Sequence, residues 1–183
     1  MKQILLAALL AAFSDAALAG NVYAGGSIGY AHASLDCAGT TDCGKEGASI
    51  KGLAGYRFKD TYAAEIAYFN LNDLKSTLAG GSVRLRSSAL DVRGLAFMSV
   101  DQDAVAFAAL GASLTRSAVS SSFDGARERA SKNSLMPLVA LGIDYSLTLS
   151  IKLRSEIEAR RFKAPAGGTY SVLGVSFGLN SDF

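Results

Sequence analysis

Tryptophan is absent from this 183-residue chain, and there are only two prolines, two cysteines and one histidine. The formal net charge is only +2, so the chain lacks the basic excess that is typical of nucleic-acid-binding proteins. Half of the residues are nevertheless hydrophobic, and glycine occurs 19 times. This combination of high apolar content and abundant glycine is unusual for a soluble domain.

The chain also lacks an apolar run of membrane-spanning length, which requires about 20 residues. A shorter apolar run near the start follows Lys2 and precedes Ala17-Leu18-Ala19, a small-x-small cleavage pattern. We therefore predict a signal peptide over residues 1–19, export by the Sec route and a mature domain over residues 20–183. An exported, apolar chain without a spanning helix can reside in a membrane as a closed barrel, because lipid leaves open sheet edges unsatisfied.

Eight segments alternate between apolar and polar residues, which is the period of β-strands. Their connections are short and long in turn, as expected for periplasmic turns and extracellular loops. We interpret the long connections, including "NDLKSTLAGGS" and "RSAVSSSFDGARERASKN", as loops. The sequence thus predicts an all-β, eight-stranded antiparallel up-and-down transmembrane β-barrel, monomeric, in a Gram-negative outer membrane. The expected strands are 22–31, 48–58, 62–71, 84–98, 104–115, 135–147, 150–162 and 170–181.

The segment 150–162 indicates which face points into the barrel. Its apolar residues alternate with Lys152, Arg154, Glu156, Glu158 and Arg160. A charge facing lipid at mid-membrane costs about 2–4 kcal/mol, so we expect the charged face inside. A soluble lipocalin-like barrel would place the apolar face inside, and periodicity alone does not distinguish the two. Clustering of both charge signs on single faces favours the membrane arrangement. The orientation of segment 104–115, which carries no charge, stays open.

Several stretches resemble strands of the transmembrane domain of outer membrane protein A. "YAGGSIGY" is similar to its first strand, "YAAEIAYF" to its third and "LDVRGLAF" to its fourth. "MPLVALGIDYSLTLSIKLRSEIEARRF" is similar to its sixth and seventh strands. The resemblance covers most of residues 21–183 and implies an OmpA-like small barrel. The peptidoglycan-binding domain of outer membrane protein A has no counterpart here, so we expect a stand-alone barrel without cell-wall anchoring.

The same resemblance implies an ion-pair gate inside the barrel. The matching positions are Glu65, Arg93, Asp144 and Arg154, where Arg93 replaces a lysine of the family and Asp144 a glutamate. On this interpretation, loss of Glu65 would leave Arg93 and Arg154 to share Asp144. The strand pattern adds further lumen charges, which we expect to neutralise one another: Lys51, Arg57, Asp91, Lys152, Glu156 and Glu158.

Catalytic chemistry has little support in the sequence. A lipid A deacylase-like enzyme would use a serine, a histidine and an acid together. His32 has Ser34 two residues away, but no familiar catalytic motif surrounds them. Paired catalytic carboxylates at Glu156 and Glu158 are a weaker alternative than mutual neutralisation of the lumen charges. We predict no enzymatic activity and no cofactor.

Both cysteines, Cys37 and Cys43, lie in the first long connection, in "CAGTTDC". Because the periplasm is oxidising, we predict a disulfide between them. Closing so short a loop would contribute roughly 2 kcal/mol to stability. A metal site is the alternative, but two cysteines without further ligands are too few for one.

The last segment carries an apolar face that ends on an aromatic residue. Val175, Phe177, Leu179 and Phe183 share this face and resemble the signal read by the barrel-assembly machinery. We therefore predict that this strand pairs with the first one after insertion, which removes the free edge.

Two arginines are predicted to contact lipopolysaccharide. Arg84 and Arg86 share parity with the outward Leu90, but lie toward the long-connection end of their strand. There an outward arginine can reach headgroup phosphates by bidentate hydrogen bonds. The alternative is a bulge at Ser87-Ser88 that turns both arginines inward.

These features together predict a structural or interaction protein of the outer membrane with surface-exposed loops and a charge-plugged interior. The expected partners are outer-membrane lipid, lipopolysaccharide, the barrel-assembly machinery and an extracellular ligand of the loops, with no nucleic acid. A narrow or gated pore for ions or small solutes is the main alternative. A lipid A-modifying enzyme is a weaker one.

Overall fold

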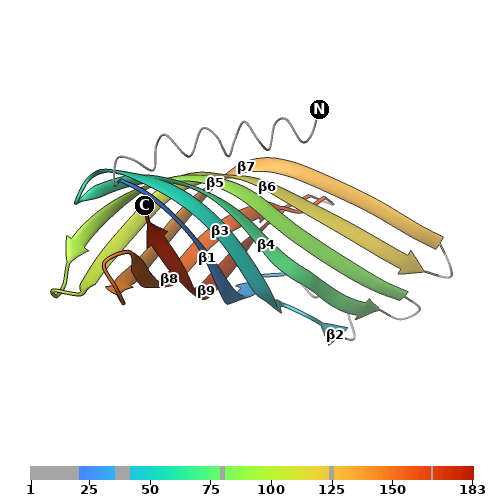
Figure 1. Ribbon diagram of the computed structural model, residues 1–183. Coiled ribbons are helices and arrows are strands. Elements are labelled where there is room, and N and C mark those ends of the chain that lie inside the picture. The colour runs from blue at the N-terminus through green and yellow to red at the C-terminus, as the bar shows by residue number, and fades with distance from the viewer. Residues whose placement is uncertain (1–20, 36–41, 79–80, 124–125, 166) are drawn as a thin grey trace, which may run out of the picture.

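Nine β-strands make up the described part of the computed structural model, which covers residues 21–35, 42–78, 81–123, 126–165 and 167–183 (Figure 1). The predicted signal peptide lies outside these residues. In the same ranges no helix is long and apolar enough to cross a membrane. The strands are β1 (Val22–Ala33), β2 (Asp42–Cys43), β3 (Glu46–Lys59), β4 (Tyr62–Leu78), β5 (Gly81–Ser99), β6 (Ala104–Phe123), β7 (Ala126–Ser146), β8 (Ile151–Lys163) and β9 (Thr169–Asp182).

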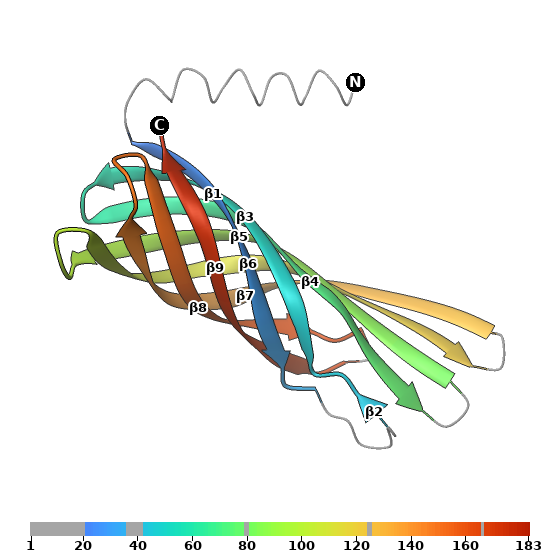
Figure 2. The ribbon, with the colours of Figure 1, turned by 60° about the horizontal axis from the view of Figure 1, so that its bottom comes forward.

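The eight long strands close into an antiparallel barrel, which confirms the predicted fold. Their hydrogen-bonded order is β4-β3-β1-β9-β8-β7-β6-β5, and β5 pairs with β4 to close the ring. The first and last strands are joined as expected, with Ile28 of β1 opposite Phe177 of β9. The two-residue strand β2 pairs with β4 and lies beside the end of that strand (Figure 2).

Strands β4, β5, β6 and β7 run well beyond the rest of the barrel (Figure 2). Pairing continues to Leu78 opposite Gly81, and to Phe123 opposite Ala126. The prediction that the two connecting stretches are loops is therefore wrong over most of their length. Outside lipid a strand needs no apolar face. The alternation of apolar and polar residues that identifies a spanning strand is therefore lost there, although backbone pairing continues. We call this part the protruding sheet, and it consists of residues 71–78, 81–88, 116–123 and 126–137.

Charged side chains point into the barrel, and large apolar side chains point outward. Arg93 is 2% exposed, whereas its chain neighbour Val92 is 61% exposed. The orientation of β6, left open by the sequence, places Phe107 inside and Leu110 outside. The lipocalin-like alternative is wrong, because it requires the opposite arrangement. Outward apolar side chains form a belt around the barrel that includes Ile28, Ile50, Ile66, Leu90, Leu110, Leu141, Ile157 and Phe177.

Two apolar clusters fill the interior on either side of the charged side chains. Eight strands enclose little more than the space that side chains fill. The cluster toward the short turns includes Tyr23, Leu53, Leu95, Phe97 and Phe107. The cluster toward the protruding sheet includes Phe69, Leu71, Leu74, Leu85, Phe162 and Tyr170.

Two inward aromatic rings lie directly over glycines of the neighbouring strand. Tyr23 pairs with Gly55, and Phe107 pairs with Gly142. A Cβ atom at either glycine would overlap the ring, so only glycine leaves room for it. The position over Gly55 also brings the Tyr23 hydroxyl to Glu65, to which it donates a hydrogen bond of 2.7 Å.

Gly55→Ala should lower the free energy of unfolding by about 1–3 kcal/mol, because its methyl group displaces the Tyr23 ring. Gly94→Ala is the matched control, since a Cβ atom there meets nothing within 4 Å. Its effect should stay within about 0.5 kcal/mol. Urea denaturation of the refolded protein in lipid vesicles, followed by gel mobility, measures both. Equal stability of the two variants would contradict the packing described here.

Candidate functional site

The four residues of the predicted ion-pair gate meet in the middle of the barrel. Glu65 on β4 lies between two arginines. Arg93 Nε donates to its Oε2 at 2.7 Å, and Arg154 Nη1 donates to its Oε1 at 2.5 Å. Arg154 also donates to both carboxylate oxygens of Asp144, at 2.7 and 2.8 Å. None of the four side chains is more than 2% exposed, so each needs these ion-pair partners to stabilise its charged form away from water.

The same contacts continue through residues that the strand pattern predicts only as lumen charges. Arg93 donates to both carboxylate oxygens of Glu156, at 2.7 and 3.0 Å. Lys51 on β3 bridges Glu156 at 2.5 Å and Glu158 at 3.0 Å. Arg160 then bridges Glu158 at 2.7 Å and Asp91 at 3.1 Å. Every base therefore contacts two acids.

The result is a linear network in which acids and bases alternate across the lumen. Five acids face four bases, so the network has one more carboxylate than cations. Hydroxyl donors stabilise two of the buried carboxylates, because Tyr23 donates to Glu65 and Ser113 donates to Asp91 at 2.5 Å. We call it the interior charge network, and its members in order of contact are Asp144, Arg154, Glu65, Arg93, Glu156, Lys51, Glu158, Arg160 and Asp91.

Two sequence-based expectations change with this order. The sequence pattern places Arg160 on the inward face but not in the charge cluster, although it links Asp91 to the rest and lies over the Phe69 ring at 3.9 Å. The sequence leads to the expectation that Arg93 and Arg154 would share Asp144 after loss of Glu65, but Arg93 already contacts Glu156 as its second acid. Strand pattern gives the inward face, but only the closed register decides which inward charges meet.

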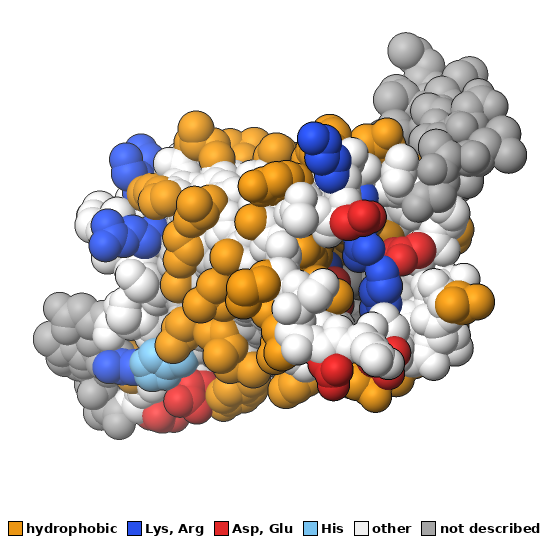
Figure 3. Space-filling model, turned by 90° about the vertical axis from the view of Figure 1, so that its left-hand side faces the viewer, with side chains coloured by type: hydrophobic (Ala, Val, Ile, Leu, Met, Phe, Trp, Pro, Cys, Tyr) orange, Lys and Arg blue, Asp and Glu red, His pale blue; other side chains and the backbone are white. Residues whose placement is uncertain are grey.

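Arg57 and Lys152 lie apart from the network, at the mouth of the barrel near the short turns. Both approach Asp182, near the end of β9, at 4.0 and 2.6 Å. Figure 3 shows basic and acidic side chains side by side in this mouth. Arg57 also lies over the rings of Tyr23 and Phe97, which extends the apolar cluster toward the opening. Sequence reasoning did not single out Asp182.

On the outer surface, basic residues follow directly beyond the apolar belt. Arg116 lies two residues beyond the apolar Leu114 on β6, and Arg86 lies four residues beyond Leu90 on β5. A further row of cross-strand neighbours consists of Lys75, Arg84, Ser120 and Arg129. We call the exposed basic side chains of these rows the outer basic patch: Lys75, Arg84, Arg86, Arg116 and Arg129.

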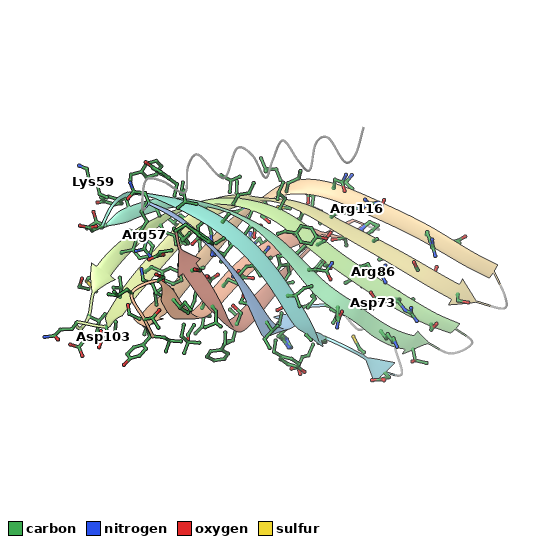
Figure 4. All side chains as sticks on the ribbon, in the orientation of Figure 1. Arg57, Lys59, Asp73, Arg86, Asp103 and Arg116 are labelled. Carbon is green, nitrogen blue, oxygen red and sulfur yellow. The ribbon has the colours of Figure 1, made fainter. Side chains whose placement is uncertain are left out.

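Asp73 is the acid in contact with this patch. It occupies a β-bulge of β4 that lies opposite Arg86. Arg86 donates to both of its carboxylate oxygens, at 2.8 and 3.1 Å, and Arg84 approaches it to 3.6 Å. Figure 4 shows Asp73 and Arg86 next to each other on the protruding sheet, with Arg116 on the same sheet. The hydrogen bonds from Arg86 hold the pKa of the Asp73 carboxyl below its usual value.

Arg84 and Arg86 both point outward, and their side chains are 55% and 66% exposed. The alternative of a bulge at Ser87-Ser88 is wrong, because pairing between β5 and β6 runs through these residues without a shift. The irregularity lies on β4 instead, where the Asp73 bulge leaves the arginines on the outer face.

A serine–histidine pair does not form among the described residues near His32. His32 Nδ1 lies 3.2 Å from Glu46 Oε1, and Tyr30 donates to the same carboxylate at 2.8 Å. Ser34 is bonded to the backbone of Ser171 on β9 instead. In the described ranges no group of three or more His, Cys, Asp and Glu side chains could hold a metal ion.

The remaining predicted sites are the cysteine pair and the outward face of the last strand. Cys43 is in β2, opposite Ser76 of β4, but Cys37 lies outside the described residues, so the disulfide stays a prediction. The outward face of β9 carries Val175, Phe177 and Leu179 into the apolar belt. Beyond them, the Phe183 N–H donates to the Val22 carbonyl at 2.9 Å.

Comparison with known proteins connects this architecture to a family. The family model described as the OmpA-like transmembrane domain matches residues 17–159. The chain belongs to the OmpA-like family. This confirms the resemblance found in the sequence. A comparison with curated protein sequences finds no match.

Solved structures give the same fold for this OmpA-like barrel. Neisserial surface protein A (NspA) has 16% identity and a TM-score of 0.68, over 90% of this chain and 98% of that one. Ail, the attachment invasion locus protein of Yersinia pestis, has 15% identity and a TM-score of 0.59, over 89% and 99%. Ail has also been solved with the heparin analogue sucrose octasulfate. The protein is thus an outer-membrane β-barrel of the OmpA, NspA and Ail type.

Glu65→Gln should destabilise the barrel more than Asp144→Asn, because Glu65 joins two arginines and Asp144 contacts one. Breaking a buried ion pair costs roughly 3–5 kcal/mol in soluble proteins. We expect a loss near the lower end, about 3 kcal/mol, for Glu65→Gln and about half of it for Asp144→Asn.

The readout is urea denaturation in lipid vesicles, with Glu46→Gln as the exposed control. That control should change stability by less than about 0.5 kcal/mol. Combining Glu65→Gln with Arg154→Met should cost less than the sum of the two single changes, since they share one contact. Equal losses for the two buried acids, or simple additivity, would contradict the linear network.

Proposed function

We propose that the protein is a closed outer-membrane barrel that binds lipopolysaccharide phosphates through the outer basic patch. The observation that carries this proposal is the position of the patch along the barrel axis, just beyond the apolar belt. Arg116 and Arg86 lie only two and four residues beyond the last apolar row. At about 3.3 Å per residue, both guanidinium groups fall within about 15 Å of the apolar belt, where headgroups lie. Arginine there can hold phosphate by bidentate hydrogen bonds.

The charge of the patch supports the same proposal. The patch has five basic side chains, and two of them, Arg84 and Arg86, pair with one acid, Asp73, which leaves an excess of four positive charges. Asp73 holds Arg84 and Arg86 side by side, so less side-chain freedom is lost when they bind a shared anion. In the part of the chain that the structure describes, Lys75, Arg116 and Arg129 have no ion-pair partner. These three cations are therefore available to an external anion.

The complex of Ail with sucrose octasulfate supports the proposal by analogy. That ligand is a densely anionic sugar, and lipopolysaccharide likewise presents anionic groups on a sugar. A barrel of the same fold with exposed basic residues on its extracellular side is suited to such chemistry.

We infer that the interior conducts no ions, so the gated pore is the less supported alternative. The interior charge network lies between two apolar clusters, and hydrophobic constrictions exclude water and ions. Opening a pathway would require displacement of Phe69 and Phe162 as well as a change of ion-pair partners.

Planar-bilayer recording tests this inference on the parent protein and on Glu65→Gln. Neither should give stepwise conductance, because the change leaves both apolar clusters in place. A large outer-membrane porin in the same bilayer serves as the positive control. Sustained single-channel steps from the parent protein would contradict a closed barrel.

Arg86→Gln combined with Arg116→Gln should reduce the lipopolysaccharide retained by the purified protein about fivefold to thirtyfold. Each lost phosphate contact is expected to cost about 0.5–1 kcal/mol at an exposed site. Lys59→Gln, at the end of β3 beside the short turn, is the matched charge control and should leave retention unchanged. Retention is measured as lipid A phosphate per barrel. Equal retention in the double variant and the parent would contradict the proposed contact.

We also propose roles for the last strand and for the extracellular part of the barrel. Val175, Phe177, Leu179 and Phe183 would present the signal for the assembly machinery while β9 is still unpaired. The barrel would function as a monomer without catalytic activity, and its extracellular part would contact ligands at the cell surface.

A further inference from the structure

The two edges of the protruding sheet differ. On β4 the chain covers its own edge, since Cys43 pairs with Ser76 and the Gly44 N–H donates to the Lys75 carbonyl at 2.9 Å. On β7 the pairing with β8 ends at Leu138, although β7 begins at Ala126. Among the described residues, none pairs with residues 126–137 of β7 on this side. An open strand edge is a template for pairing with another chain.

The direction of the backbone groups at this edge follows from the hydrogen bonds at the other end of β7. The Ser146 N–H donates toward β6, to Asp103 O at 2.8 Å, and the Leu147 N–H donates toward β8, to Ile151 O at 2.9 Å. Backbone groups point to opposite sides at successive residues of a strand. Pairing of β6 with β7 has no register shift, so even-numbered residues of β7 face β6 throughout.

Odd-numbered residues of β7 consequently face the open edge. Ser131, Asn133 and Leu135 direct their N–H and C=O groups there, where no described residue accepts or donates. Pro137 is also odd-numbered and has no N–H to offer to β8, and the pairing with β8 stops beside it. The edge therefore presents the alternating donors and acceptors that a further strand requires.

A cleft of about 380 Å³ lies beside this edge, between Lys132 of β7 and the described residues 163–165 and 167–169. Its lining includes Lys132, Lys163, Pro165 and Thr169, and no acidic residue. Both lysines are exposed. Within the described ranges neither has an ion-pair or hydrogen-bond partner. The cleft therefore offers two free ammonium groups next to unpaired backbone groups.

We propose that the open edge of β7 binds an extended acidic segment of a partner polypeptide. The segment adds as a strand beside Ser131, Asn133 and Leu135, and its carboxylates contact Lys132 and Lys163. Backbone pairing selects an extended peptide, because a polysaccharide lacks the regular alternation of amide donors and acceptors. A second copy of this chain is a poorer occupant, since it would bring a second excess of basic residues. This edge is separate from the phosphate contacts proposed above.

The test uses the mature protein in lipid nanodiscs and a fluorescent peptide of alternating glutamate and valine. Ser131→Pro removes one edge N–H that the β6 pairing does not use, and Ser131→Ala is its matched control. We expect Ser131→Pro to weaken binding at least about tenfold and Ser131→Ala less than about twofold. Lys132→Gln with Lys163→Gln should weaken binding about fivefold and reduce its salt dependence. Bound peptide should slow amide exchange at Asn133 and Leu135.

Several results would contradict strand addition or indicate a different occupant of the edge. Equal binding of a peptide of alternating glutamate and proline, which cannot pair as a strand, would overturn strand addition. Unchanged binding by Ser131→Pro, or no binding to the parent protein, would overturn it as well. If heparin competes with the peptide at the lysines and its own binding is unchanged by Ser131→Pro, the site binds a polysaccharide, which would overturn the proposal. If the parent protein self-associates and Ser131→Pro does not, the occupant is a second copy of this chain, which would overturn it too. Normal gel mobility confirms that each variant is folded.

Discussion

Each charge inside this barrel requires a partner of opposite sign, because eight strands enclose only the space that side chains fill. The interior charge network meets that requirement by placing every base between two acids, across five strands of the ring. β8 alone contributes Arg154, Glu156, Glu158 and Arg160. A shift of β8 by one residue would turn all four toward lipid, so the network also specifies the register of the barrel.

The membrane boundary divides the four longest strands into two parts, and the outward positions of each part tolerate different side chains. Within the belt, outward positions must be apolar, as Leu90 and Leu114 are. Beyond it, water satisfies polar side chains, and Arg86 and Arg116 occupy the same outward face. The strands continue because the pairing of β4 with β5, and of β6 with β7, still satisfies the backbone groups. The basic residues thus occupy the first outward positions beyond the apolar belt. There a charge is not buried in hydrocarbon, and headgroup phosphates are within reach.

Closure removes strand edges only as far as all eight strands extend. Where β4 to β7 continue alone, two edges reappear. β2 covers one of them, while the other ends its pairing with β8 near Pro137. An edge of this kind is usually protected by charged residues, and Lys132 has that position here. The same lysine that discourages pairing with a neutral or basic strand makes an acidic strand the matching partner.

Sequence alone determined the eight spanning strands and their charged inner faces. Two constraints act at every position of such a strand: side chains alternate, and a charge in lipid is costly. Glu65, Arg93, Asp144 and Arg154 are therefore identifiable as inward residues from the alternation of their strands. The protruding strands were missed, because residues 116–122 and 128–134 face water on the outside and carry no such alternation. Tertiary structure alone decided the orientation of β6, the position of Asp73 beside Arg86 and the order of contacts through Arg160. These depend on a bulge and on the closed register, which bring together residues from different strands that no periodicity within one strand relates.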